Sequence, residues 1–177
     1  VVRVTGAPVT WDQTARAAVL GAGELAFVSH ASAVRWYGLE TKVPGDVLEL
    51  SAPLARHIRI AGVRAHRCGT LEPGDIVRRR GIACSSALRL VLDLSSRLPL
   101  SVLGELVDEL LRRKLLRLDD LRERVDRTRP APGRSTRKLR AVLAGRIRDY
   151  DPGESALEAR IVRVIRRHGF PPPVQQH

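Results

Sequence analysis

The chain has 177 residues, of which 44% are hydrophobic and 28% are charged, with a net charge of +12. This balance is typical of a folded globular protein and excludes a disordered chain. No apolar run approaches the roughly 20 residues that a membrane-spanning helix needs, so we expect no membrane partner.

Two helices are predicted within residues 10–38. Thr10 can cap a helix over residues 11–20, and Ser29 or Ser32 can cap a short second helix that ends at Gly38. Large aromatic rings bury more area than other side chains, and four of the six aromatic residues fall in this region. We therefore expect the N-terminal core to form around Trp11, Phe27, Trp36 and Tyr37.

The hydrophobic period then changes from about 3.6 residues to 2, which predicts strands. Glycine at Ala61-Gly62 and Arg80-Gly81 supplies the positive φ that tight hairpins require. The expected strands cover residues 46–50, 57–60, 63–67, 75–79 and 82–84. The predicted fold class is therefore α/β in a mixed α+β form, with a small mixed sheet of four or five short strands packed by helices.

The second half of the chain is predicted to be helical. Its first helix, from Ser86 through Leu98, is apolar nearly all round and should be buried. Pro130, Pro132 and Gly133 indicate a linker. Further helices are expected over residues 100–116, 118–125, 135–147 and 154–168.

Few residues form a chemical site that is recognisable from the sequence. The histidines and cysteine at His30, His57, His66 and Cys68 have a spacing that matches no usual zinc-ligand pair, and His57 and His66 are expected on strands that face solvent. Cys68 and Cys84 are expected to be reduced, partly buried thiols of a cytoplasmic protein.

The other polar residues of interest have structural interpretations. Ser85 and Ser86 are expected to cap a helix, because the motif of a serine nucleophile at a strand–helix turn is absent. Asp93 and Glu105 are expected to be surface or capping carboxylates. No residue of this chain is therefore predicted to be catalytic.

Basic residues gather in three places. The first is the run Arg78–Arg80, which fits either the tip of a hairpin that reaches a phosphate or merely a solvent-exposed sheet edge. Arg112 and Arg113 are expected to pair with Asp108 and Glu109 at i,i+4 spacing. Residues 127–148 contain eight basic residues and no acidic one, which favours nucleic-acid binding over a solvated face. The candidate nucleic-acid-binding residues are Arg127, Arg129, Arg134, Arg137, Lys138, Arg140, Arg146 and Arg148.

The order of several motifs resembles a known family. The motifs are Ser29-His-x-Ser-Ala-x-x-x-Tyr-Gly-Leu39, Gly62-Val-Arg-x-His-Arg67, Leu71-x-Pro-Gly-Asp75, Arg80-Gly-Ile82 and Ala87-Leu-Arg-Leu-Val-Leu-Asp-Leu94. Together they resemble the AbiEi-type antitoxins of type IV toxin–antitoxin systems, in the form fused to a very-short-patch-repair-like endonuclease domain. The resemblance covers most of residues 1–150.

This resemblance implies a division of the chain into an AbiEi-like α/β effector domain (1–128), a basic Pro/Gly linker and helix (129–152), and the first helix of a truncated nuclease-like domain (153–177). Glu158 falls where the family places an acid on that helix, as a remnant of the nuclease-like site. The family's winged helix-turn-helix would precede Val1, and the nuclease's further metal ligands would follow His177.

The resemblance implies a regulatory or antitoxin domain that counters a nucleotidyltransferase-like toxin, with DNA as a further partner of the basic segment. It implies no cofactor, since a divalent metal would serve only a complete nuclease domain. Two alternatives remain open at this point. One is an inactive fragment of a DNA endonuclease, and the other is a degenerate product without activity. The sequence does not indicate the oligomeric state.

Overall fold

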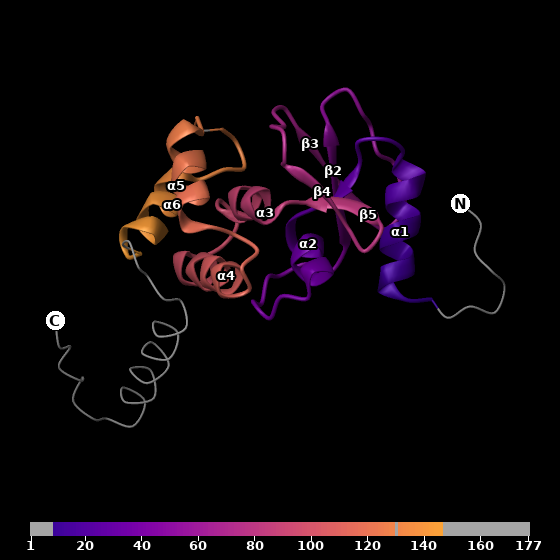
Figure 1. The fold of residues 1–177 in the computed structure, drawn as a ribbon. Coiled ribbons are helices and arrows are strands. Elements are labelled where there is room, and N and C mark those ends of the chain that lie inside the picture. Colours follow the sequence, from indigo (N-terminus) through magenta and orange to yellow (C-terminus); the bar gives the residue numbers. More distant parts are fainter. Residues whose placement is uncertain (1–8, 130, 147–177) are drawn as a thin grey trace.

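The computed structural model describes residues 9–129 and 131–146, which form six helices and one five-stranded mixed sheet (Figure 1). The predicted mixed α+β class, with a helical C-terminal half, is confirmed. Within the described residues, no helix combines the length and the apolar character needed to cross a membrane.

The two helices predicted in the N-terminal region are present, with a short strand between them that the sequence does not predict. Helix α1 (Trp11–Ala22) opens with a capping box, in which the Thr10 side chain accepts a hydrogen bond from the backbone N–H of Gln13. A two-residue strand, β1 (Phe27–Val28), leads directly into helix α2 (His30–Tyr37). The next residue, Gly38, ends α2 in the left-handed conformation (φ 66°) that glycine adopts without strain.

The sheet has the strand order β3-β2-β1-β5-β4. The central β1 pairs antiparallel with β2 (Leu48–Pro53) and parallel with β5 (Ile82–Ser85). Strand β4 (Ile76–Arg79) forms the predicted hairpin with β5. Strand β3 (Val63–Cys68) lies at the opposite edge and runs parallel to β2.

The predicted hairpin between residues 57–60 and 63–67 is wrong. Residues 57–60 form no strand, and β3 pairs with β2 instead. Ile58 and Ile60 alternate with polar residues because they are partly buried against the core. The alternation of apolar and polar residues at 57–60 therefore reflects side-chain burial and not strand pairing.

Four helices follow the sheet: α3 (Ala87–Leu94), α4 (Leu100–Arg112), α5 (Leu118–Arg127) and α6 (Thr136–Ala144). Helix α3 is buried as predicted but ends four residues earlier than expected, at Leu94. Leu139 and Val142 pack α6 into the same core as α4 and α5. The helix expected over residues 154–168 lies outside the described residues.

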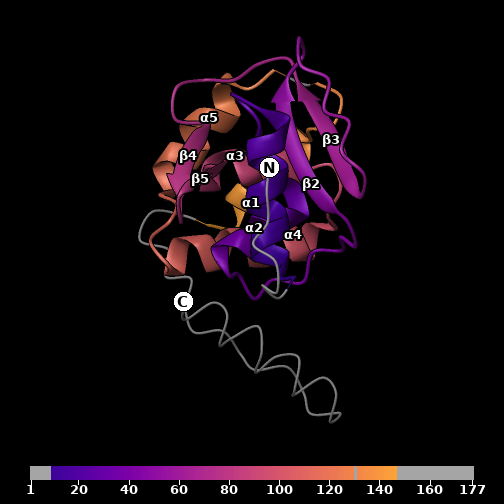
Figure 2. The ribbon, with the colours of Figure 1, turned by 90° about the vertical axis from the view of Figure 1, so that its right-hand side faces the viewer.

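The sheet lies between α1 and the bundle formed by α3, α4, α5 and α6 (Figures 1 and 2). The predicted aromatic core is confirmed, because Phe27 and Trp36 are almost fully buried. The Trp36 indole N–H donates to the carbonyl of Arg79 at 3.0 Å, and the Tyr37 hydroxyl donates to the carbonyl of Ser85 at 2.9 Å. These two bonds attach α2 to the β4–β5 hairpin.

Candidate functional site

A buried carboxylate stands at the centre of the first polar cluster. Glu49 lies on β2 and is fully buried, with Oε2 accepting the backbone N–H of Ala31 at 2.9 Å. Its Oε1 accepts a hydrogen bond from Arg97 at 2.7 Å and lies 3.2 Å from Nε2 of His66. Burial alone would raise the pKa of Glu49, but the bonds from His66, Arg97 and Ala31 outweigh it and lower the pKa to about 2. The carboxylate is therefore ionised at neutral pH.

Two serines join strand β2 to the start of α2. The β2–β3 register places Ser51 beside His66 on one face of the sheet. The Ser51 hydroxyl bonds the Ser29 hydroxyl at 2.7 Å, and Ser29 Oγ lies 3.0 Å from Nδ1 of His30. Ser29 occupies the predicted N-cap position, but its hydroxyl bonds these two side chains and no helix N–H. We call Ser29, His30, Glu49, Ser51, His66 and Arg97 the Glu49 cluster.

His30 occupies an unusual position in this cluster. Its ring stacks on the ring of His66 with the centroids 3.8 Å apart, so His66, with 27% of its side chain exposed, faces solvent only in part. Its backbone φ is +51°, which is uncommon for a residue other than glycine. Burial, and next the neighbouring His66, lower the pKa of His30 to about 3. The imidazole is therefore neutral at physiological pH.

A second buried network joins α3 to α5. Arg89 Nε donates to both carboxylate oxygens of Asp93 at 2.8 and 2.9 Å, and Arg89 Nη1 bonds Asp75 at 3.0 Å. Arg124 bonds Asp75 at 2.9 Å and Glu72 at 2.6 Å. We call these five residues the Arg89 network.

The expectation that Asp93 is a surface or capping carboxylate is wrong, because its side chain is only 6% exposed. Helix α3 is enclosed on nearly all sides, so its polar residues are enclosed with it. The i,i+4 spacing places Arg89 next to Asp93 and supplies the partner that a buried charge needs.

A cleft of about 480 Å³ lies between the two clusters. Its lining combines His30, Ser51 and His66 with Arg89 and Asp93. The turn between α5 and α6 closes one side with Arg134, whose side chain is 16% exposed and lies 4.0 Å from Asp93. Further lining residues include Arg67, Cys68 and Thr70.

Four of the sequence motifs meet at these clusters. Ser29 and His30 come from the first motif, His66 from the second, Asp75 from the third, and Arg89 and Asp93 from the buried-helix motif. Sequence reasoning missed this convergence, because the spacing of His30 and His66 matches no zinc-ligand pair and His66 is expected on a strand that faces solvent. The alternation Leu48-Glu-Leu-Ser51 was the available signal, since it places Glu49 and Ser51 on one face of a strand with apolar neighbours on the other.

Comparison with protein-family models, with curated proteins and with solved structures finds no match for this chain.

Several basic residues of the 127–148 segment are paired with groups elsewhere in the chain. Arg146 is largely buried and pairs with Asp108 of α4 at 2.7 Å. Arg127 pairs with Glu123 at 2.9 Å. The Lys138 ammonium donates to the carbonyl of Leu98 at 2.7 Å and to that of Ser96 at 3.2 Å. These contacts give Arg146, Arg127 and Lys138 structural partners.

Three arginines of the same segment differ from these. Arg129, Arg137 and Arg140 are exposed and form no ion pair with any part of the chain that the structure describes. Arg134 lines the cleft, and Arg148 lies outside the described residues. Nucleic-acid binding by this segment stays a prediction, with Arg129, Arg137 and Arg140 the residues best placed for it.

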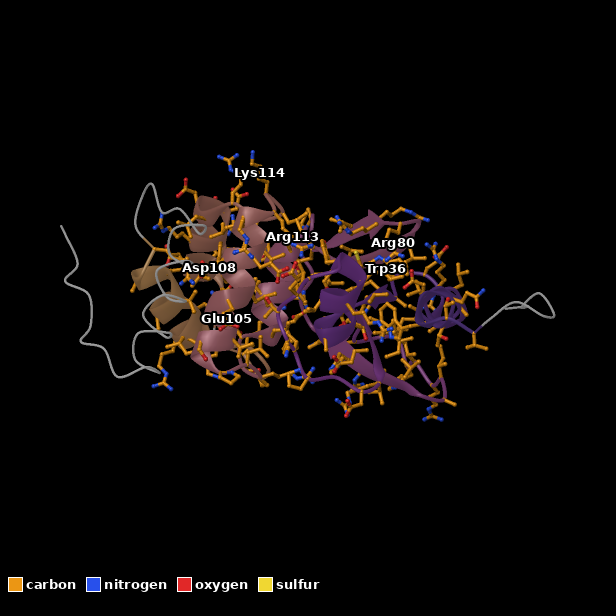
Figure 3. The ribbon with its side chains drawn as sticks, turned by 90° about the horizontal axis from the view of Figure 1, so that it is seen from below. Trp36, Arg80, Glu105, Asp108, Arg113 and Lys114 are labelled. Carbon is orange, nitrogen blue, oxygen red and sulfur yellow. The ribbon has the colours of Figure 1, made fainter. Side chains whose placement is uncertain are left out.

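The other basic clusters have partners as well. The Arg80 guanidinium lies 4.4 Å from the ring centroid of Trp36 (Figure 3). Arg80 also pairs with Asp12, and Arg79 lies over the ring of Tyr37. These contacts favour the structural interpretation of the hairpin tip. The predicted pairing of Arg113 with Glu109 is confirmed, at 2.7 Å.

No group of three or more His, Cys, Asp or Glu side chains is arranged to hold a metal ion within residues 9–129 and 131–146. Glu158, the remnant nuclease-like acid, lies outside these residues. Cys68 and Cys84 are buried free thiols, and burial raises the pKa of both.

Proposed function

We propose that this chain is the regulatory domain of an AbiEi-type antitoxin, which counters a nucleotidyltransferase-like toxin and contacts DNA through exposed arginines. The observation that carries the proposal is the convergence of three motifs on one cleft, with a fourth, through Asp75, in the adjoining Arg89 network. These motifs are the residues on which the family resemblance rests.

Buried polar clusters support a functional interpretation of this convergence. A buried ion pair is often no more stabilising than well-packed apolar residues of the same volume. The Glu49 cluster and the Arg89 network thus place buried charged and polar side chains around one cleft, although apolar side chains in their place would stabilise the fold equally well. A domain that must recognise a ligand or partner has a reason to keep them.

Antitoxin action is tested by co-expression with a nucleotidyltransferase-like toxin of a type IV system from the same genome. The full 177-residue chain is expected to restore growth of cells that the toxin arrests. An active-site variant of the toxin, which arrests nothing, controls for the burden of expression. Persistent arrest, with the folded chain present in the cells, would contradict the proposal.

The DNA contact is assigned to Arg129, Arg137 and Arg140, because these side chains are exposed and without an ion pair among the described residues. Arg137 and Arg140 are three residues apart on α6 and share one face of the helix. Lys138 is not assigned to this DNA contact, because its ammonium bonds two backbone carbonyls after α3.

The double variant Arg137→Gln/Arg140→Gln is expected to bind duplex DNA more weakly than the unmodified chain. The slope of log K against log salt should become shallower by about 0.9 for each phosphate contact removed. Fluorescence anisotropy over a salt series measures both quantities. Arg56→Gln/Arg59→Gln, which removes the same charge from an exposed loop, is the matched control. Equal weakening of DNA binding by the two double variants would show that binding depends only on the net charge of the chain.

A further inference from the structure

We propose that the cleft between His30 and Arg134 binds a small molecule that carries a phosphate monoester and has the size of a nucleoside monophosphate. This inference does not depend on the antitoxin proposal, because it rests on the lining of the cleft alone.

The charge around the cleft is unbalanced. Three arginines line it, Arg67, Arg89 and Arg134, against one carboxylate, that of Asp93. Arg89 is neutralised by Asp93, at 2.8 and 2.9 Å, and by Asp75, at 3.0 Å, whereas Arg134 approaches Asp93 only to 4.0 Å. Burial, and next the neighbouring guanidinium of Arg89, lower the pKa of Arg134, although arginine keeps its charge. A bound anion would neutralise this excess of positive charge.

His30 supplies a further donor at the same place. Its side chain lines the cleft, the residue is only 9% exposed, and Nδ1 is engaged with Ser29. The arrangement in which Ser51 donates to Ser29 and Ser29 donates to Nδ1 leaves the proton of the neutral ring on Nε2. In the part of the chain that the structure describes, Nε2 has no hydrogen-bond partner. Nε2 is accessible from the cleft, where it can donate a hydrogen bond to a bound anion.

The positive φ of His30 places this donor. Such strained residues persist where the surrounding structure holds them, and they cluster at ligand-binding positions. The bonds of Ser29 to Ser51 and to His30, and the stacking of His66, provide that support.

The size and the donor arrangement indicate the class of ligand. A volume of about 480 Å³ lies within the range of roughly 300–1,000 Å³ that is usual for small-molecule sites. The polar residues that line the cleft come from three separate elements, with Arg67 on β3, His30 on α2 and Arg134 before α6. This spread suits the three terminal oxygens of a phosphate monoester better than the two oxygens of a carboxylate.

The test is a titration of the ¹⁵N-labelled 177-residue chain, followed by long-range ¹H–¹⁵N spectra of the histidine rings. Without ligand, His30 is expected to show the neutral form with the proton on Nε2. Adenosine monophosphate and inorganic phosphate should both shift the His30 ring signals, whereas adenosine and acetate should not. Shifts with adenosine or acetate but not with phosphate, or with none of the four, would overturn the proposal.

Variants add a second test. Arg134→Gln and His30→Asn are each expected to weaken adenosine monophosphate binding at least tenfold, as measured by calorimetry. Asparagine tolerates positive φ and retains a short polar group beside Ser29, but it does not reach the cleft. Arg59→Gln, on an exposed loop, should bind with unchanged affinity. Unchanged affinity of Arg134→Gln, or equal weakening by Arg59→Gln, would overturn the proposal.

Discussion

Replacing Asp75 by alanine is expected to lower the free energy of unfolding by about 3–5 kcal/mol. Asp75 is 1% exposed and accepts hydrogen bonds from Arg89 at 3.0 Å and Arg124 at 2.9 Å. Without the Asp75 carboxylate, the buried Arg124 loses its closest buried carboxylate. Arg89 then keeps Asp93 as its one carboxylate partner within α3. Removing one partner of a buried charge network leaves the other charges uncompensated, which is among the costliest single changes.

Urea denaturation with linear extrapolation measures this loss. Asp119→Ala is the matched control, because the Asp119 carboxylate is 76% exposed and pairs only across one helix turn with Arg122. Exposed pairs of this kind contribute about 0–1 kcal/mol. Similar losses for the two variants would show that the Arg89 network does not hold α3 against α5.

Stability is expected to fall by about 2–3 kcal/mol as the pH decreases from 6.5 to 4.5, because of His30 alone. The pKa of His30 is lowered to about 3 in the folded chain, whereas an unfolded histidine titrates near 6.5. The unfolded chain therefore binds the proton more tightly, so acid favours unfolding. Glu49, with its pKa lowered to about 2, adds to the loss only below about pH 4.5.

Denaturation at a series of pH values tests this prediction. His30→Asn removes the titrating group and should flatten the stability profile between pH 6.5 and 4.5. His57→Asn changes an exposed histidine and should leave the profile as it is. An unchanged slope in His30→Asn would mean that the imidazole is not held neutral by burial.

The elements that the sequence predicted well are those set by local chemistry. The Thr10 capping box, the left-handed Gly38 and the Arg80-Gly81 turn act within a few residues, so their spacing is visible in the sequence. Strand β1 has only two residues and shows no period. The parallel pairing of β2 with β3 joins residues about 15 apart, and no local pattern encodes it.

The candidate site was harder to predict for the same reason. Arg146 lacks an acidic neighbour in its own segment, yet its partner Asp108 lies 38 residues earlier. In the sequence, Glu49 is simply one polar residue of an alternating strand. Its partners His66 and Arg97 lie 17 and 48 residues further along the chain. Composition within a segment therefore gives the net charge of the 127–148 region, but not which of its side chains pair with distant parts of the chain.

The central claim, that the cleft around His30 is the functional site of an antitoxin domain, is tested most directly by growth rescue in the toxin co-expression strain. The unmodified chain and His57→Asn are expected to restore growth, while His30→Asn, present at the same level and folded, is expected not to. Rescue by His30→Asn equal to that of the unmodified chain, or no rescue by the unmodified chain, would contradict the claim.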